Sequence, residues 1–232
     1  MKRIACLSLS LIMALPIAAQ AQSTEQERIT ASTNVLREII QMPDKGIPHD
    51  LLDKAECVLV YPSVKKAAFV VGGSYGRGLI TCRTGVNHNG PWSPPAMYAL
   101  EGASFGLQIG GQATDFILLI MNPEGAKSVM SSKVKLGGDA SVAAGPVGRN
   151  TSAETDIVMK AQILSWSRAR GVFAGISLAG STMRSDNDAN KALYGKELTA
   201  TDIVYGGKVK APAVAAPLLS LLTKTTPRHI VK

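Results

Sequence analysis

The sequence predicts an α+β domain, mainly antiparallel, with a strand-rich sandwich or barrel-like core and helices at the N- and C-termini. Two observations support this fold class. The main helical segments, at residues 23–41 and 186–224, lie at the two ends of the chain. Between them, residues 57–183 form short extended runs separated by glycine and proline. No linker or low-complexity stretch divides the chain, so residues 22–232 are predicted to form a single domain.

The first 21 residues have the pattern of a secretory signal peptide. Lys2 and Arg3 give a positive start, an apolar run follows over residues 4–19, and Ala19-Gln20-Ala21 is an A-x-A cleavage site. Cys6 lies ahead of the apolar run, so no lipid anchor is expected. The leader looks bacterial. We therefore expect a mature chain that begins at Gln22 and is periplasmic or secreted, or is peripheral at an envelope membrane.

The N-terminal helix is predicted at residues 23–41, where Ile29, Leu36 and Ile40 form one apolar stripe. Ser23 or Thr24 can cap its first turn. Its polar face has a net charge of −1, whereas a helix that lies on a membrane would have a basic face. We therefore expect this helix to dock on the core. A short helix follows, from residue 49 or 50 to residue 56.

Extended segments then dominate until the C-terminal helices. The expected strands and extended runs are 57–61, 67–71, 78–83, 97–112, 115–121, 134–147, and a pair at 157–167 and 170–183. A helix of one to three turns is expected at 123–132, with proline at its first position. Short helices are expected at 186–194 and 201–205, followed by an apolar helix at 212–224.

The stretch YPSVKKAAFVVGGSYGRGLITCR, residues 61–83, combines basic side chains with glycine. A turn predicted at 62–66 carries Lys65 and Lys66, and a predicted loop carries Arg77 among Gly72, Gly73, Gly76 and Gly78. Glycine can take positive φ or admit a neighbouring backbone, and consecutive backbone amides can hold an anion. The same residues also suit a tightly bent, solvated hairpin, and glycine clusters mark turns more often than sites.

Charge and cysteine content narrow the possible partners. Removing Lys2 and Arg3 with the leader lowers the formal net charge from +8 to +6, and aromatic residues make up only 5% of the chain. Few aromatic platforms are thus available for stacking bases, so nucleic acid is not an expected partner. An anionic membrane surface fits this charge better. Cys57 and Cys82 remain in a compartment that permits disulfides, and the sequence leaves open whether they are bridged.

Catalytic motifs find little support. Residues 72–76 match G-x-S-x-G, which would make Ser74 a nucleophile, but that motif requires a following helix, and the next residues are extended. Only His88 and His229 are available downstream as a base. The sequence lacks metal-ligand spacing and nucleotide-binding motifs. We therefore expect a protein that is not an enzyme and uses no cofactor; a serine hydrolase is a remote alternative.

Four long motifs resemble the SYLF-domain family, also called the lipid-binding or actin-binding SYLF domain. They are YPSVKKAAFVVGGSYGRG, WSPPAMYALEGASFGLQIGGQATDFILLIM, KLGGDASVAAGPVGR and ILSWSRARGVFAGISLAGS, followed by Asn190 and Tyr194-Gly195. The resemblance implies a compact domain without catalytic residues. It also implies binding of phosphoinositide membranes and actin in eukaryotic members, and presumed lipid binding in exported bacterial members.

Carried onto this chain, the resemblance makes its basic motif positions candidates for lipid binding: Lys65, Lys66, Arg77, Lys135, Arg149, Arg168 and Arg170. The expected function is non-enzymatic binding of anionic phospholipid at a bacterial envelope membrane surface. The alternative is an envelope structural or protein-interaction module without a lipid ligand. An exported bacterial protein is not expected to meet actin, although other envelope proteins are possible partners.

Overall fold

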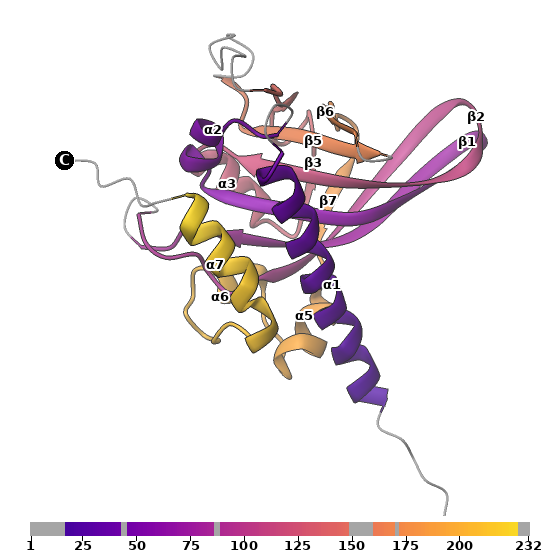
Figure 1. Ribbon diagram of the computed structural model, residues 1–232. Coiled ribbons are helices and arrows are strands. Elements are labelled where there is room, and N and C mark those ends of the chain that lie inside the picture. The colour runs from indigo at the N-terminus through magenta and orange to yellow at the C-terminus, as the bar shows by residue number, and fades with distance from the viewer. Residues whose placement is uncertain (1–16, 43–45, 86–88, 149–159, 170–171, 227–232) are drawn as a thin grey trace, which may run out of the picture.

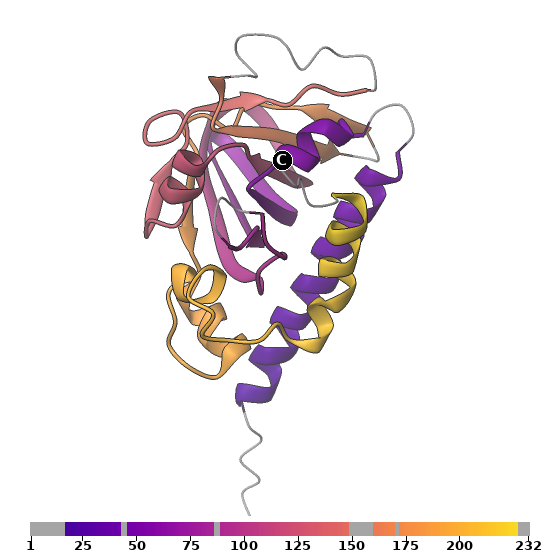
Figure 2. The same cartoon turned by 90° about the vertical axis from the view of Figure 1, so that its left-hand side faces the viewer.

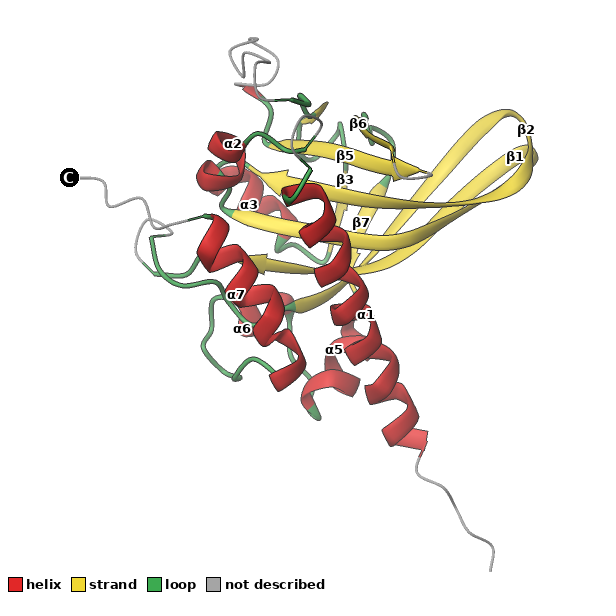
Figure 3. Ribbon diagram, viewed as in Figure 1, coloured by secondary structure: helices red, strands yellow, loops and turns green. Residues whose placement is uncertain are grey.

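The computed structural model describes residues 17–42, 46–85, 89–148, 160–169 and 172–226, with the side chains of 17–23, 66–72 and 103–112 left aside (Figure 1). It is a mixed α+β structure with a curled, strand-rich sheet and helices at both ends of the chain, which confirms the predicted fold class (Figure 3). Along the chain the helices are α1 (Ile17–Ile40), α2 (His49–Lys54), α3 (Pro123–Val129), α5 (Asn187–Tyr194), α6 (Ala200–Val204), the 3-10 turn η2 (Ala213–Ala215) and α7 (Ala216–Thr225).

Two very long strands dominate the sheet. β1 (Cys57–Cys82) and β2 (Ala96–Ile120) pair antiparallel from Cys57↔Ile120 to Ile80↔Ala96. The resulting two-stranded ribbon bends over, and its bent end projects away from the helices (Figures 1 and 3). The disulfide Cys57–Cys82 joins the first and last residues of β1 and so closes the base of the bend.

The predicted turn at 62–66 and the predicted glycine loop are therefore wrong, because β1 runs through both. A register shift between Tyr61 and Val64 accommodates Pro62 and Ser63, and Ser63 takes φ 54°. Such a bulge absorbs extra residues without ending a strand. Asp115 Oδ1 accepts the Ser63 N–H at 2.8 Å. The strands predicted at 57–61, 67–71 and 78–83 are accordingly one strand.

Close approach of the backbone explains the glycines better than loop flexibility does. Neither Gly76 nor Gly78 has positive φ. A Cβ on Gly78 would lie 2.1 Å from the Val60 carbonyl oxygen, and one on Gly76 would lie 2.4 Å from Val64 Cγ2. The two halves of β1 therefore cross so closely that only glycine fits on the returning half.

The remaining strands extend the sheet from the edge of β2 that faces away from β1, near the two ends of β2. The first part of β2 pairs with β7 (Thr182–Ser185), which pairs with the edge strand β3 (Lys133–Lys135). Its last part pairs with β5 (Ile163–Ala169), which pairs with β6 (Val172–Gly175) and, in parallel, with β4 (Val142–Ala144). The two runs predicted at 97–112 and 115–121 are thus one continuous strand, β2. The run predicted at 134–147 and the pair predicted at 157–167 and 170–183 divide, in the part that the structure describes, into shorter strands at intervening turns.

Each face of the curled sheet has its own apolar core. One face packs beneath α1, α2 and α7, which include Leu36, Leu52 and Leu218. The other face encloses Tyr61, Tyr98 and Phe116 and is capped by α3 and α6. Figure 2 shows α1 and α7 lying together beside the curled strands. The predicted docking of the N-terminal helix is confirmed, although α1 begins at Ile17, six residues earlier than expected.

Local signals explain most helix ends. Asp186 caps α5 through the Ala189 N–H, and Gly195 ends that helix at φ 72°. Thr199 and Asp202 form a capping box at α6. None of the helices described has both the length and the apolar composition that crossing a bilayer requires.

Candidate functional site

One face of the strands β1, β2, β7 and β3 carries a row of polar side chains. Directly paired residues on neighbouring strands point to the same side of a sheet. The register therefore aligns two rows, which together we call the four-strand face: Tyr75, Glu101, Thr182 and Lys135 in one, and Arg77, Ala99, Arg184 and Lys133 in the other. The opposite side carries Leu100, Met183 and Val134, which are buried in the core.

The four-strand face is basic at its edge and exposes an aromatic ring. Lys133 and Lys135 are exposed on β3, and among the described residues no carboxylate lies within ion-pair distance of either. Tyr75 is 46% exposed. Arg184 Nε donates to Glu101 Oε1 at 2.7 Å, and this hydrogen bond raises the pKa of Arg184. Two lysines and one tyrosine are thus available to a partner, while Arg184 is already neutralised.

Arg77 lies at the border of this face and belongs to a buried ion-pair cluster. Its Nε donates to Asp186 Oδ2 at 2.9 Å, and its Nη2 lies 3.4 Å from Glu25 Oε1. Arg28 joins the same two carboxylates, at 2.8 Å from Glu25 and 3.3 Å from Asp186. We call these four residues the α1 cluster; it ties the N-terminal half of α1 to β1 and to the start of α5.

The pKa values of the two acids of the α1 cluster are shifted in opposite directions, because burial prevails at one and ion pairing at the other. Burial raises the pKa of Glu25, and the nearby Arg28 and Arg77 offset this only in part. Burial also opposes ionisation of Asp186. There, however, the hydrogen bond and charge of Arg77, together with the charge of Arg28, prevail and lower the pKa of Asp186. The cluster holds two cations and two anions, so its arginines are largely compensated.

Arg168 forms a second attachment, at the other end of α1. Its Nε lies 2.6 Å from Asp115 Oδ2 on β2, and its Nη1 pairs with Glu38 of α1. Its guanidinium also stacks over Phe173, 5.7 Å from the ring centroid. Burial raises the pKa of Asp115. Arg77 and Arg168, both candidates for lipid binding, therefore also connect α1 to the sheet.

The other predicted site residues are dispersed. Lys135 shares the four-strand face with Arg77, but Lys65 is exposed on the other half of β1, opposite Ala113. The side chains of Lys66 and Gly72 lie outside the described residues, as do Arg149 and Arg170. Gly73, Gly76 and Gly78 lie within β1 and form no loop. Lipid binding by this set remains a prediction.

Tyr75 and Arg184 are not among the site residues that the sequence predicts. A signal for Arg184 exists in the four residues Thr-Met-Arg-Ser of β7, where the alternation places Met183 inside and Arg184 outside. Tyr75 sits within a glycine cluster that was interpreted as a loop. Only the strand register shows that both residues share a face with Lys133 and Lys135.

Ser74 has the surroundings of a structural residue. Its Oγ donates to the Gly102 carbonyl at 3.4 Å, and the chain continues as β1 rather than as a helix. The G-x-S-x-G pattern therefore lacks the strand–turn–helix setting of a nucleophile elbow. Both histidines considered as its base, His88 and His229, lie outside the described residues.

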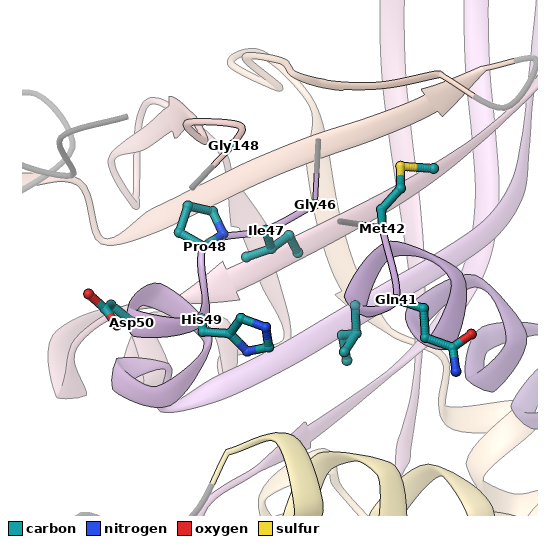
Figure 4. Close-up of a pocket in the computed structure, with 9 residues that line it drawn as sticks. Gln41, Met42, Gly46, Ile47, Pro48, His49, Asp50 and Gly148 are labelled. Carbon is teal, nitrogen blue, oxygen red and sulfur yellow. The ribbon is translucent and has the colours of Figure 1, made fainter. Parts of the chain in front are cut away.

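A hollow of about 300 Å³ between the end of α1 and the start of α2 offers no catalytic pair either (Figure 4). Among the described residues that line it, the titratable pair His49 and Asp50 point in different directions, and the Asp50 carboxylate points away from the hollow. Across the ranges that the structure describes, no group of His, Cys, Asp and Glu side chains could hold a metal ion.

Comparison with known proteins identifies relatives of this chain by sequence. The family model described as Ysc84, Las17-binding protein actin regulator, matches residues 101–225. The SH3 domain-containing protein PJ696.02 of Schizosaccharomyces pombe is 38% identical over 180 residues, which are 76% of this chain and 40% of that protein. Protein YSC84 of Saccharomyces cerevisiae is 35% identical over 184 residues, covering 77% of this chain and 38% of the relative.

An animal protein is similar over more of this chain. The SH3 domain-containing YSC84-like protein 1 of Mus musculus is 31% identical over 204 residues, which are 85% of this chain and 58% of that protein. The chain thus spans between 38% and 58% of the length of these curated relatives. The family is described as a regulator that binds other proteins, and that description names no enzymatic activity.

Proposed function

Because the chain belongs to the Ysc84 family of SYLF domains, we propose that it is a non-enzymatic binding module that attaches to anionic phospholipid surfaces through the four-strand face. The observation that carries this proposal is the combination of exposed Lys133 and Lys135 with exposed Tyr75 on one sheet face. Tyrosine is enriched where membranes meet water, and lysines near an anionic leaflet contribute about 1 kcal/mol each.

The expected strength follows from these contributions. Two lysines supply roughly 2 kcal/mol, about thirtyfold in affinity, without any deep pocket. Lys65 is exposed on the neighbouring half of β1 and adds to the same field if the surface reaches it. Arg77 contributes less, because the carboxylates of Asp186 and Glu25 already compensate much of its charge. We therefore expect Lys133 and Lys135 to contribute more to binding than Arg77 does.

We further propose that the protein is exported after cleavage behind Ala21. The disulfide between Cys57 and Cys82 supports an oxidising compartment. Cleavage there would remove only the first five residues of α1, Ile17–Ala21, and would leave Glu25 and Arg28 in the mature chain. Intact-mass measurement of periplasmic protein tests this: the mass should correspond to a chain starting at Gln22, and a lipid-sized increment or a retained leader would contradict it.

Vesicle co-sedimentation tests the lipid proposal. The double variant Lys133→Glu, Lys135→Glu should lose binding to phosphatidylglycerol-containing vesicles and keep its thermal stability. A matched control, Lys54→Glu with Lys224→Glu, makes the same change in net charge at exposed helical positions. It should retain most of the binding. Wild-type binding should also weaken steeply as salt is raised.

Two results would contradict the proposal. One is equal loss of binding in the site and control variants, which would mean that only net charge matters. The other is equal wild-type binding to neutral vesicles at high salt. If the protein binds no vesicles at all, the alternative gains support: a protein-interaction module, in keeping with relatives named as Las17-binding and SH3 domain-containing proteins.

A further inference from the structure

A second surface feature lies between α3 and α6, where the structure has an open hollow of about 450 Å³. Its apolar lining comes from Pro123, Ala126, Met130 and the ring of Tyr205, and its polar lining includes Lys127 and Thr201. This volume lies within the range of small-molecule sites in proteins. The hollow plays no part in the proposed membrane contact through the four-strand face.

The floor of the hollow is part of the apolar core. Ala126 is buried, and Met130 packs against the same core cluster from the rim. Tyr205 remains 37% exposed although its hydroxyl lies 3.7 Å from the buried Cys57 Sγ. The ring is therefore held in place at its polar end while one side stays open to the hollow. The hollow therefore presents apolar side-chain surface to the solvent.

Charge at the rim selects the head group of such a ligand. Lys127 is exposed and is the only charged residue of the lining, and within the described part of the chain no carboxylate forms an ion pair with it. An apolar trough with one cation at its rim is complementary to an amphiphile with a hydrocarbon chain and an anionic head. A neutral head loses the attraction, and a cationic head is repelled.

The hollow also lies next to β3, the edge strand of the four-strand face, although α3 and α6 cover the opposite side of the sheet. Met130 and Ser131 continue directly into β3, and Ser131 Oγ donates to the Lys133 carbonyl at 3.2 Å. The residues that line the hollow are thus only two positions from Lys133, at the edge of the four-strand face. We propose that the α3–α6 hollow binds one acyl chain of an anionic lipid, with the chain against Met130 and Tyr205 and the head at Lys127. This deepens the proposed membrane contact and rests on it for the source of lipid.

Methionine-methyl NMR with dodecyl phosphate, used below its micelle concentration, tests the site directly. The Met130 methyl signal, assigned with Met130→Leu, should shift saturably, while the signals of the buried Met97 and Met183 stay fixed. Dodecyl maltoside, which has the same chain and a neutral head, should bind about fivefold more weakly, the equivalent of one lysine near an anion. Lys127→Glu should weaken dodecyl phosphate binding at least fivefold.

A filling variant separates this site from the membrane face. Thr201→Trp places a ring over the hollow from an exposed position and should abolish the Met130 shift. Thr223→Trp, at an exposed position on α7, should leave the shift intact. Equal Met130 shifts in wild type and Thr201→Trp, or equal affinity for the maltoside and the phosphate, would overturn the proposal.

Vesicle binding distinguishes the two proposals. Thr201→Trp should still co-sediment with anionic vesicles through Lys133 and Lys135, whereas the Lys133→Glu, Lys135→Glu variant should still shift Met130 with dodecyl phosphate. Loss of vesicle binding in wild type, with the Met130 shift preserved, would contradict the membrane face alone. Loss of the shift with vesicle binding preserved would contradict the hollow alone.

Discussion

The long strands β1 and β2 contribute both to the sheet beneath α1 and to the four-strand face. The two regions differ in whether their basic side chains have carboxylate partners. Where α1 meets the sheet, Arg28 of α1 and Arg168 of β5 each have carboxylate partners within 3.3 Å. On the four-strand face, Lys133 and Lys135 have none among the described residues. An unpaired charge costs free energy when it is buried, whereas water solvates it when it is exposed. Two basic residues of the family motifs, Arg168 and Lys135, are therefore structural in one region and available to a partner in the other.

The largest expected effect comes from breaking the α1 cluster. Asp186→Ala leaves Arg28 without one of its two partners in a buried site and removes the cap of α5. We expect a loss of roughly 3–5 kcal/mol in the free energy of unfolding, measured by denaturant titration. Glu101→Ala, which breaks the exposed pair with Arg184 on the four-strand face, should cost less than about 1 kcal/mol. Similar losses in both variants would erase the contrast between the two regions.

The pH dependence of that contrast has a definite sign. The folded-state pKa of Asp186 is depressed below its usual value of 3.8, so its contribution is present above that value and is lost as pH falls through the folded pKa. The stability gap between wild type and Asp186→Ala should therefore narrow in acid. Glu25 has a raised folded pKa and acts in the opposite direction, since the native state takes up its proton first.

Next in size is the closure of the ribbon base. The disulfide joins residues separated by 25 positions, for which chain entropy predicts about 3.5 kcal/mol of stabilisation. The double variant Cys57→Ser, Cys82→Ser should lose about this much in denaturant titration. Adding a reductant to wild type should approach the same value, whereas the double variant should not respond to it. A reductant effect on the double variant would show that the loss has another cause.

The sequence predicted the helices well because their signals are local. The apolar stripe of α1, the cap of α5 at Asp186 and the capping box of α6 at Thr199 each consist of residues that are close together in the sequence. The fold class also follows from such patterns. By contrast, the continuity of β1 through Pro62 depends on a bulge satisfied by Asp115, which is 52 residues away. A proline and a glycine cluster favour a turn locally, and only the distant partner makes a strand possible.

The candidate site was less predictable for the same reason. Which cations are free depends on whether carboxylates reach them from elsewhere, as Asp186 does for Arg77 across 109 residues. The four-strand face joins β1 and β2 to β7 and β3, and no local pattern fixes that pairing. The sequence therefore indicated a basic surface and two of its members, Arg77 and Lys135, but it placed Arg77 in a loop rather than on a strand and did not indicate Tyr75 or Arg184.

Two glycines of β1 are expected to differ in how much stability a substitution by alanine costs. Gly78→Ala would place a Cβ 2.1 Å from the Val60 carbonyl, where the halves of β1 cross, and should cost about 1–3 kcal/mol. Gly73→Ala, in the same glycine cluster, would meet only the Gly102 carbonyl at 3.9 Å. Its effect should stay within about 0.5 kcal/mol. Equal thermal shifts in both variants would mean that the crossing of the strands is not the reason for the glycines.

The smallest effect on stability, and one confined to binding, is expected at Tyr75. Its side chain is 46% exposed, so Tyr75→Ala should change the free energy of unfolding by less than about 0.5 kcal/mol. If the ring enters the membrane interface, burying part of its exposed area supplies roughly 1 kcal/mol, and the variant should bind anionic vesicles about fivefold more weakly. Val172→Ala is the matched control, because Val172 is 60% exposed on β6, away from this face. It should bind as wild type does. A weakening that is equal in both variants would show that the vesicle contact does not use the four-strand face, whereas a loss confined to Tyr75→Ala would place that face against the membrane.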